Sequence, residues 1–497
     1  MKRLEGERLR VERENKLLKE QIRLMLLEKY GAKSDRLSDG QLALLELEPG
    51  VVAAEIAIEA QCEESEKKAV EKIRQRSHPG RNELPAHLPR VEKIISCTAQ
   101  QCRCAQCGKD TKVIGYDVSE ELDVKPVEYR VLVIKREKRA CGQCEEMGVS
   151  AAPLEAKIIE KGKASNAVVV DVIIKKYCDH LPLYRQCAIL DREIGVELSR
   201  ATLCGWVMQS GLWLESISAA MRADLLSGSY IQADETTVGV QSRVTPGSNH
   251  RSYVWQYSRP GGPVVFDFQM GRGREGPKKF LGEFSGTLQS DGYSAYDRIG
   301  GEGITYAGCM AHARRGFVDA MKVEPGDRAL AEIVEEIAQL YAVEKKAREI
   351  GLTHQERACL RKLRSEPLLA ALKEKIVRTR QQVLPQSAAG KACAYALGQW
   401  NRLMVYATRG EVEIDNNWCE NAMRPVVLGR KNWLHIGSAE AGPRIAAISS
   451  VIESCKRLAI NARDYLLDVL PKIPGWPANR VAELTPQAWA ASNAAQR

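Results

Sequence analysis

The spacing of hydrophobic residues predicts a helix near the N-terminus. Within the highly charged residues 1–30, apolar residues recur seven positions apart, at Leu4, Val11, Leu18 and Met25. A heptad repeat of this kind is typical of a short coiled coil that mediates self-association. Arg8 and Asn15 interrupt the second apolar seam, so a plain amphipathic helix is the alternative interpretation.

A second helical pattern follows after residue 160. We expect three helices there, at residues 168–177, 182–190 and 200–208. Ser199 is a suitable N-cap for the third helix, and Gly195 lies in the turn before it. Two helices joined by a short glycine-containing turn resemble a helix-turn-helix, with Arg200, Thr202 and Trp206 on the second helix. An ordinary helical hairpin fits the same pattern.

From Ser229 onward the pattern changes to the alternation of β-strands. We expect strands at residues 230–240, 251–259, 263–270, 286–291 and 304–309, and helices at 278–283 and 311–321. Three meandering strands, a helix, and then strand–helix–strand–helix is the order of a ribonuclease H-like sheet. In such a sheet the first and fourth strands lie side by side, so Asp234 and Asp291 would meet at one end.

Two further regions have the three-to-four spacing of amphipathic helices. Residues 327–400 are charged and predict a helical insertion, and residues 443–470 predict another helical region before three prolines break the chain.

The stretch between these regions combines polar, basic and aromatic residues. Three polar residues at steps of four would share one face of a short helix: Asn416, Glu420 and Arg424. Pro425 should end or kink that helix, and the cations Arg430 and Lys431 follow with Trp433. The bland alternative is a capping box between Asn417 and Glu420, which would only satisfy free amides at the helix start.

Composition limits the class of protein. A chain of 497 residues is long enough for three to four domains, and its net charge of +9 is compatible with a phosphate-rich partner. No apolar run is long enough to span a bilayer, and the N-terminus lacks an apolar signal core, so we expect a cytoplasmic, nucleoid-associated location and no membrane partner. In that compartment the 15 cysteines should be thiols, metal ligands or packing residues.

Two Cys-x-x-Cys pairs indicate a structural zinc site. The four thiols are Cys104, Cys107, Cys141 and Cys144. Tyr129, Val131 and Val133 alternate between the pairs and predict a strand of a zinc ribbon. Ordinary buried cysteines are the alternative. Cys309 and His312 also have a zinc-like spacing, but two further ligands are not evident, so we expect them to pack at a helix start.

Three carboxylates carry the candidate chemistry: Asp234, Asp291 and Glu420. Two strand-end aspartates and a helix glutamate supply hard oxygen ligands, which suit Mg²⁺ or Mn²⁺ better than Zn²⁺. Such a cluster can hold two metal ions for in-line attack on a phosphodiester. Taken one at a time, each aspartate is more simply a solvated turn residue; the expected topology favours the triad.

These features together resemble the insertion-sequence-66 family of bacterial DDE transposases. The similarity extends over most of the chain, and its most specific part is the stretch from Asp415 to Trp433. Other matching motifs are Asp234-Glu-Thr, Gln289-Ser-Asp-Gly-Tyr, Cys309-Met-Ala-His-Ala-Arg-Arg315 and the two cysteine pairs. The resemblance implies that Asp234, Asp291 and Glu420 are the catalytic DDE triad. Asn421 replaces the arginine usual after the glutamate, and His435 replaces an aromatic residue, but neither change removes a metal ligand.

The resemblance also implies a multidomain α+β architecture. We expect a leucine-zipper-like helix at residues 1–48, a linker at 49–95, a zinc-binding domain at 96–150, a helical DNA-binding-like segment at 160–225, a ribonuclease H-like catalytic domain at 226–445 with a helical insertion at about 325–410, and a C-terminal helical element and tail at 446–497.

The implied activity is DNA cleavage and strand transfer at the ends of an insertion sequence. Catalytic Mg²⁺ or Mn²⁺ and structural Zn²⁺ would be the cofactors. The expected partners are the terminal inverted repeats and target DNA, a second copy of the chain, and accessory proteins of the same element. The expected DNA contacts are Arg424, Arg430, Lys431, Trp433 and Asn417. The alternative hypotheses are a catalytically decayed DNA-binding regulator, a solvated basic face in place of the DNA contacts, and a ribonuclease H-like nuclease.

Overall fold

The structure, a computed structural model, describes residues 11–23, 129–135, 138–140, 149–151, 155–160, 162–241 and 248–494. The chain divides into two compact units. Residues 62–153 form the smaller unit, and residues 1–61 and 154–497 form the larger one.

Little of the smaller unit is described. Its two short strands, β1 (Lys138–Ala140) and β2 (Val149–Ala151), pair in antiparallel fashion. The strand expected at Tyr129, Val131 and Val133 is wrong, because residues 129–135 have no regular structure and Val131 is 90% exposed. Alternation alone does not make a strand: among the described residues this segment pairs with no strand, and its apolar side chains from Val131 to Ile134 are exposed. The four cysteines of the predicted zinc site lie outside the described residues.

The larger unit begins with helices that match the predicted ones. Residues 11–23 are helical, followed by α5 (Asn166–Tyr177), α6 (Leu183–Ile194) and α7 (Arg200–Leu226). Gly195 ends α6 in a left-handed conformation, with φ of 64°, and Ser199 caps α7 by accepting a hydrogen bond from the Thr202 amide.

The helix α7 is much longer than the hydrophobic pattern predicts, and it is a core helix. It continues to Leu226, and a row of its side chains is buried against the sheet and the C-terminal helices. Of the three residues named for a recognition helix, Trp206 is only 9% exposed and packs inward, whereas Arg200 and Thr202 are exposed. Both the helix-turn-helix and the ordinary helical hairpin fit this arrangement.

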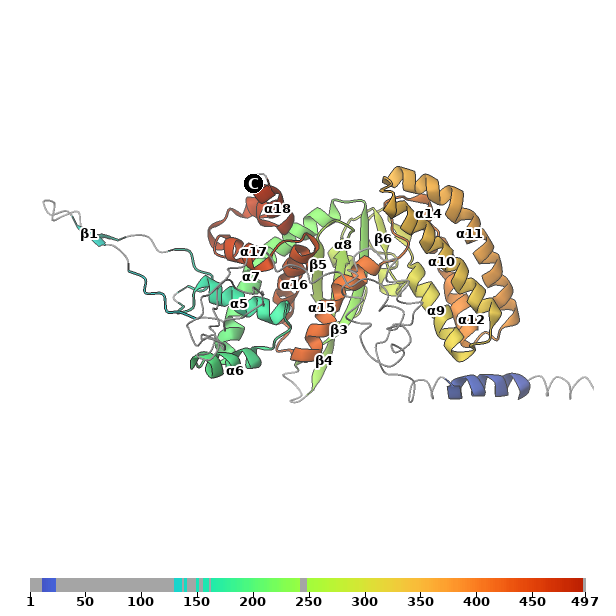
Figure 1. Cartoon of the computed structure of the whole chain (residues 1–497), viewed down its shortest axis with the longest axis horizontal. Coiled ribbons are helices and arrows are strands. Elements are labelled where there is room, and N and C mark those ends of the chain that lie inside the picture. Colours follow the sequence, from blue (N-terminus) through green and yellow to red (C-terminus); the bar gives the residue numbers. More distant parts are fainter. Residues whose placement is uncertain are drawn as a thin grey trace, which may run out of the picture. The chain divides into compact units, whose positions relative to one another are not determined.

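The centre of the larger unit is a six-stranded sheet (Figure 1). Its strands are β3 (Tyr230–Gln241), β4 (Asn249–Ser258), β5 (Val264–Gln269), β6 (Thr287–Gln289), β7 (Thr305–Ala307) and β8 (His435–Ile436), with α8 (Glu275–Leu281) between β5 and β6. The order is β5-β4-β3-β6-β7, and β8 pairs with the far end of β3. The expected adjacency of the first and fourth strands is confirmed, because β3 and β6 pair in parallel.

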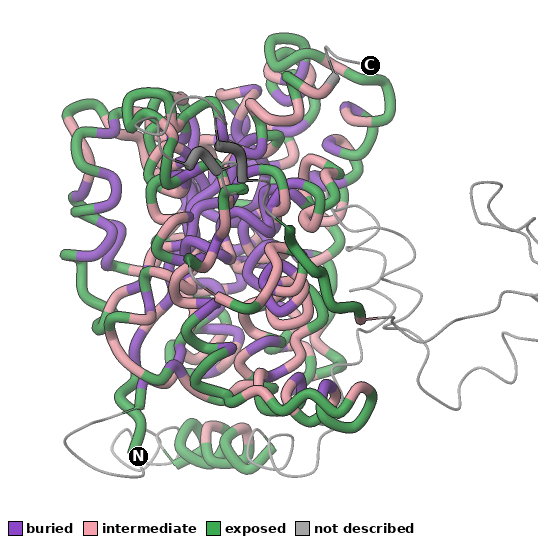
Figure 2. Tube along the Cα trace, turned by 90° about the vertical axis from the view of Figure 1, so that its left-hand side faces the viewer, coloured by how far each residue is buried: buried purple, intermediate pink, exposed green. Residues whose placement is uncertain are grey.

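The two faces of the sheet have different partners. Odd-numbered residues of β3, such as Ile231 and Ala233, join the core with α7, whereas even-numbered Val238 and Val240 pack with α15 (Asn417–Trp433). This alternation follows from the two-residue period of a strand. Buried residues accordingly concentrate in the sheet and the helices beside it (Figure 2). The side chain of Asp234 therefore belongs to the face that α15 covers.

The helix α15 does not end at Pro425. It runs from Asn417 to Trp433 with the proline inside it, so the expected break is wrong. A proline within a helix costs about 3 kcal/mol. Val426 and Val427 lie directly after it and pack against the sheet, and this burial offsets the cost.

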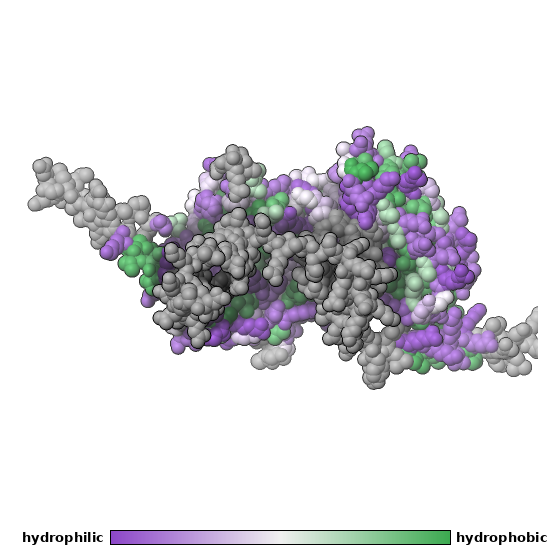
Figure 3. Space-filling view, in the orientation of Figure 1, coloured by the Kyte–Doolittle hydropathy of each residue, from purple (hydrophilic) through white to green (hydrophobic). Residues whose placement is uncertain are grey.

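A helical insertion separates β7 from α15, as the sequence predicts. It consists of α9 (Met310–Val323), α10 (Arg328–Glu349), α11 (His354–Gln382), α12 (Ala388–Gly398), α13 (Trp400–Leu403) and α14 (Val405–Thr408). These helices have a core of their own, which reaches the sheet through Tyr230 and Ala307. On the face shown in Figure 3, hydrophilic and hydrophobic residues are interspersed over the insertion.

The chain ends in helices that pack beside α7. They are α16 (Ala441–Arg457), α17 (Ala462–Val469) and α18 (Pro486–Ala494). Ser450 and Ser454 of α16 accept hydrogen bonds from the amides of Phe266 and Val264 on the edge strand β5, which pairs those otherwise open backbone groups. Within the described ranges, no helix is long and apolar enough to cross a membrane.

A buried ion pair connects the insertion to the loop before α15. The Arg361 side chain is fully buried, donates to both Glu344 oxygens at 2.7 and 2.6 Å, and also donates to the carbonyls of Tyr406, Arg409 and Val412. Removal of the guanidinium would take the cation from the buried Glu344 carboxylate, whereas the three carbonyls would each keep one other donor: the amides of Arg409 and Val412 and the side chain of Arg357.

We therefore predict that Arg361→Met lowers the free energy of unfolding by about 3–5 kcal/mol, because Glu344 is left charged and buried. Urea denaturation followed by tryptophan fluorescence measures the change. Arg364→Met, at an exposed position of the same helix, is the matched control and should change stability by less than about 0.5 kcal/mol. Equal midpoints for the two variants would contradict the prediction.

Candidate functional site

The register of the parallel strands β3 and β6 places Asp234 and Asp291 at the same height along the two strands. Gln232 lies opposite Gln289 in the parallel pair. Asp234 and Asp291 each follow two residues later, and neighbouring strands are about 4.8 Å apart. The strand β6 ends at Gln289, and Asp291 Oδ1 accepts a hydrogen bond from the Tyr293 amide at 2.8 Å in the turn that follows. The expected meeting of Asp234 and Asp291 at one end of the sheet is therefore consistent with the register.

Asp234 is surrounded by other acids. Burial raises the pKa of its carboxyl well above the ordinary value, and the carboxylates of Glu420, Glu235 and Asp291 raise that pKa further. A hydrogen bond from the Glu235 amide has the opposite effect. A cluster that disfavours its own ionisation in this way is stabilised by a bound cation.

Glu235, although adjacent in sequence, belongs to a different environment. Its carboxylate accepts hydrogen bonds from Arg272 at 2.7 Å and from the Tyr296 hydroxyl at 2.8 Å. Its side chain is only 3% exposed. The acid already has a cation and a hydroxyl as partners, so it is not a candidate metal ligand.

Glu420 lies in the first turn of α15, where it faces α9. Its Oε1 is 3.5 Å from His312 Nδ1, and its Oε2 is 3.6 Å from a terminal nitrogen of Arg315. The alternative of a capping box with Asn417 is wrong, since the N-cap residue is Asn416 and it makes no side-chain cap. Instead, Asp415 Oδ1 accepts a hydrogen bond from the Asn417 amide at 3.1 Å, and Asp415 Oδ2 accepts one from Tyr341. The Glu420 side chain is therefore not used to cap the start of α15.

Two buried glutamines hold these elements together. Gln232 Nε2 donates to the Asp415 carbonyl at 2.8 Å, and Gln232 Oε1 accepts from the Cys419 amide at 3.1 Å. Gln289 Nε2 donates to the carbonyls of Gly308 and Glu413 at 2.8 and 2.9 Å. These contacts join the two strands to the chain that leads into α15, and so position Glu420 relative to Asp234.

Sequence reasoning missed both glutamines. The available signal is a repeated Gln-x-Asp pattern, which places a polar residue two positions before Asp234 and again before Asp291 inside otherwise apolar strands. A polar side chain at a core position of a strand needs a hydrogen-bond partner, which in this protein is the backbone of a distant loop.

Several polar atoms around the start of α15 are buried and make no hydrogen bond within the described residues. They include Asn416 Oδ1 and Nδ2, Asn417 Nδ2, Asn421 Nδ2, Glu420 Oε1 and His312 Nδ1. Such groups are rare in folded proteins unless water, an ion or a ligand satisfies them. Their concentration at one place marks this region as a binding site.

The five expected DNA contacts have unequal positions. Lys431 is exposed and Arg424 is partly exposed. Asn417 is only 5% exposed, so the prediction that it contacts DNA is wrong for the structure described here. Arg430 donates to the hydroxyls of Thr236 and Thr237 at 3.0 Å each and ties α15 to β3.

Trp433 packs within the protein. It lies against the hydrophobic cluster beneath α15 and lines a pocket with Tyr177 and His180. The ammonium group of Lys176 is 5.6 Å from the centre of its ring. Through these contacts the indole stabilises the C-terminal end of α15 within the protein itself.

Four families match the chain. Residues 161–444 match the family described as "Transposase IS66 family". Residues 17–92 match "Transposase C of IS166 homeodomain", residues 101–145 match "zinc-finger binding domain of transposase IS66", and residues 450–487 match "IS66 C-terminal element". The zinc-finger match supports structural zinc.

Similar proteins occur in Sinorhizobium fredii (strain NBRC 101917 / NGR234). The chain is 33% identical to the uncharacterized protein y4jD over 432 residues, which is 83% of each chain. It is 34% identical to the uncharacterized protein y4qI over 82% of this chain and 77% of the relative. A third, the uncharacterized protein y4hP, is 29% identical over 96% of this chain and 88% of its own length.

Removal of the Gln232 amide tests its positioning role. Gln232→Leu should lower the free energy of unfolding by about 1–3 kcal/mol, because the buried Asp415 carbonyl loses the Gln232 donor and the Cys419 amide loses one of its two acceptors, the other being the Asn416 carbonyl. Denaturant titration measures the effect. Gln241→Leu, at the exposed end of the same strand, provides the matched control. The positioning role would be refuted by a Gln232 variant as stable as that control.

Proposed function

Since the chain belongs to the IS66 family of transposases, we propose that it cuts DNA at the ends of an insertion sequence and joins those ends to target DNA. The proposal assigns the chemistry to Asp234, Asp291 and Glu420. The observation that carries it is the parallel pairing of β3 with β6, which makes Asp234 and Asp291 neighbours on the face of the sheet that α15 covers.

The sheet supports a ribonuclease H-like assignment of the catalytic domain. Three antiparallel strands are followed by two parallel ones in the order β5-β4-β3-β6-β7. The first strand lies at the centre, and its acid faces the acid that follows the fourth strand. The helical insertion then returns the chain to the same site with α15, so that the third acid comes from a helix.

The three acids fit divalent metal ions. All three donors are oxygen atoms, and Asp234 is buried among carboxylates that raise its pKa, an arrangement that Mg²⁺ or Mn²⁺ would relieve. When bound, such ions lower the pKa of the attacking hydroxyl and neutralise the charge of the leaving oxygen. The chain's own contribution is to fix the acids: Gln232 and Gln289 hold the loop before α15, and Arg315 holds one oxygen of Glu420.

DNA contact is assigned to basic residues near the acids. Lys431 and Arg424 on α15 and Arg315 on α9 are exposed or partly exposed. A phosphate backbone that crosses the site would find these cations on either side of Glu420. The net charge of +9 favours the same partner. The zinc-finger region is assigned a structural Zn²⁺ held by Cys104, Cys107, Cys141 and Cys144.

The triad is tested with Asp234→Asn, Asp291→Asn and Glu420→Gln. Each should reduce Mg²⁺-dependent cleavage and strand transfer at least about a hundredfold, since a metal ligand contributes several kcal/mol to the transition state. Labelled transposon-end DNA reports both reactions, and the same variants should still bind that DNA.

Asp319→Asn, an exposed position on α9, is the control and should keep full activity. Cleavage that survives all three triad changes would refute the assignment. Binding without cleavage by the unmodified protein, with accessory proteins of the element present, would favour a regulator. Cleavage without strand transfer would favour a nuclease.

Self-association is assigned to the helix at residues 11–23. Its apolar residues Val11, Leu18 and Ile22 are 53–55% exposed, which suits burial against a second copy. Replacement of both Leu18 and Ile22 by alanine should shift the protein to a lower molar mass in light scattering. Lys19→Ala, on the same helix but outside the apolar seam, should not. A wild-type chain that is monomeric would contradict this assignment.

A further inference from the structure

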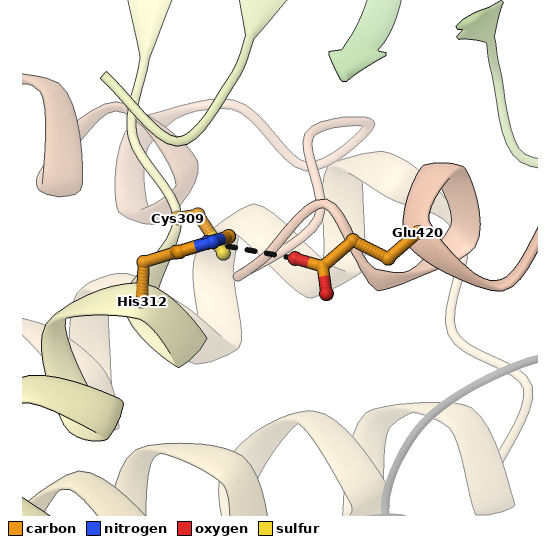
Figure 4. A group of neighbouring side chains, drawn as sticks. All are labelled: Cys309, His312 and Glu420. Carbon is orange, nitrogen blue, oxygen red and sulfur yellow. Dashed lines mark ion pairs between the residues drawn. The ribbon is translucent and has the colours of Figure 1, made fainter. Parts of the chain in front are cut away.

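Three potential metal ligands converge beside the acidic cluster. Cys309 immediately precedes α9, His312 lies in its first turn, and Glu420 approaches from α15 (Figure 4). One ligand atom from each, the thiol sulfur, a ring nitrogen and a carboxylate oxygen, lies within 4.8 Å of the other two. Sequence spacing suggested the first two and made two further ligands not evident; the structure places one further candidate, Glu420, beside them.

We propose that Cys309, His312 and Glu420 form a transition-metal site with zinc as its ion, distinct from the zinc-finger region and from the oxygen-only site of the three acids. The ligand set decides the kind of ion. A thiolate and an imidazole favour Zn²⁺ over Mg²⁺, and one carboxylate completes a mixed set that zinc accepts.

The geometry is close to that of a bound ion. Tetrahedral zinc with bonds of about 2.0–2.3 Å separates its ligand atoms by about 3.3–3.6 Å. His312 Nδ1 and Glu420 Oε1 are already 3.5 Å apart. The Cys309 sulfur lies within 4.8 Å of both atoms. Three protein ligands leave one position for water or another donor.

Two of the three ligand atoms make no hydrogen bond within the described residues. His312 Nδ1 and Glu420 Oε1 are both buried and make no hydrogen bond in the part of the chain that the structure describes. Arg315 approaches the other oxygen, Oε2, and leaves Oε1 for the ion. The side chains of His312 and Glu420 are 22% and 26% exposed, so an ion can enter from solvent.

The Cys309 thiol is held inside the protein. The residue is fully buried, and the amides of Asn416 and His312 donate hydrogen bonds to its sulfur. A coordinated metal would remove the thiol proton and balance the charge of the thiolate and the carboxylate.

Glu420 would then be shared by two metal sites, and this consequence rests on the proposed function. An ion held with Cys309 and His312 occupies a carboxylate that the catalytic ions need with Asp234 and Asp291. Zinc would therefore inhibit Mg²⁺-dependent cleavage, and the inhibition would depend on the thiol and the imidazole.

Metal content of the full-length protein tests the site without reference to activity. After saturation with Zn²⁺ and gel filtration, the unmodified chain should retain one equivalent more than Cys309→Ser or His312→Asn, as measured by plasma mass spectrometry. Co²⁺ substitution should give a thiolate charge-transfer absorption that is weaker in Cys309→Ser, since the band that remains in this variant comes from the four cysteines of the zinc-finger region. Circular dichroism verifies that each variant is folded.

Two controls separate this site from its neighbours. Cys393→Ser removes another buried thiol, on α12, and should keep the extra equivalent. Asp291→Asn should keep it as well, because Asp291 is not a ligand. Equal metal content in Cys309→Ser and the unmodified chain would overturn the proposal, as would an equivalent lost in Asp291→Asn but kept in Cys309→Ser.

Activity provides the second measurement. Zinc should slow cleavage by the unmodified chain more strongly than cleavage by Cys309→Ser, each compared with its own rate in Mg²⁺ alone. Equal inhibition would overturn the shared role of Glu420. If the unmodified protein cleaves no DNA, the proposed function fails while the metal-content measurement still decides the site.

Discussion

The hydrogen bonds of the Gln232 amide are the interaction on which the candidate site depends. This side chain is fully buried in the central strand and connects it to the carbonyl of Asp415 and the amide of Cys419, nearly two hundred residues further along the chain. Without these bonds the start of α15 would lose its direct link to the part of β3 that carries Asp234, and the position of Glu420 relative to Asp234 would be less firmly fixed. Gln289 repeats the arrangement from the neighbouring strand, so both strands that carry an aspartate also hold the loop that leads to the glutamate.

Two neighbouring acids of β3 lie in different surroundings. Glu235 and Asp234 are adjacent in sequence, yet the pleat of β3 directs the first to Arg272 and Tyr296 and the second to the acids beneath α15. Buried carboxylates without cations are costly, so the protein either pairs an acid, as with Glu235, or keeps it for an ion. Glu420 lies between the two cases, because it touches both the oxygen-rich cluster and the Cys309–His312 pair. On one side of the Glu420 carboxylate the candidate ligands are oxygen atoms, and on the other they are a thiol and an imidazole. This difference is the chemical basis of the proposed second metal site.

Long, strongly periodic segments were predictable because local pattern and tertiary packing agree in them. The strands at 230–240, 251–259 and 263–270 and the helical insertion all formed near their expected bounds. Prediction was wrong where packing overrode local signals. Pro425 did not end its helix because the valines after it are partly buried against the sheet, and α7 extended far beyond its predicted end as a core helix. Residues 129–135 formed no strand, and the apolar side chains from Val131 to Ile134 are exposed in the part of the chain that the structure describes.

The sequence by itself determined which residues could carry the chemistry: two strand-associated aspartates, a helix glutamate and a Cys-x-x-His pair, each recognisable from residue type and local spacing. The order of strands and helices along the chain was also predictable, because the period of the hydrophobic positions indicates the type and length of each element. Only the tertiary structure decided that Gln232 and Gln289 hold the site, that Arg430 and Trp433 serve the helix end, and that Glu420 faces Cys309 and His312. Those contacts join residues about a hundred or more positions apart, and their partners are backbone groups or side chains that no local period specifies.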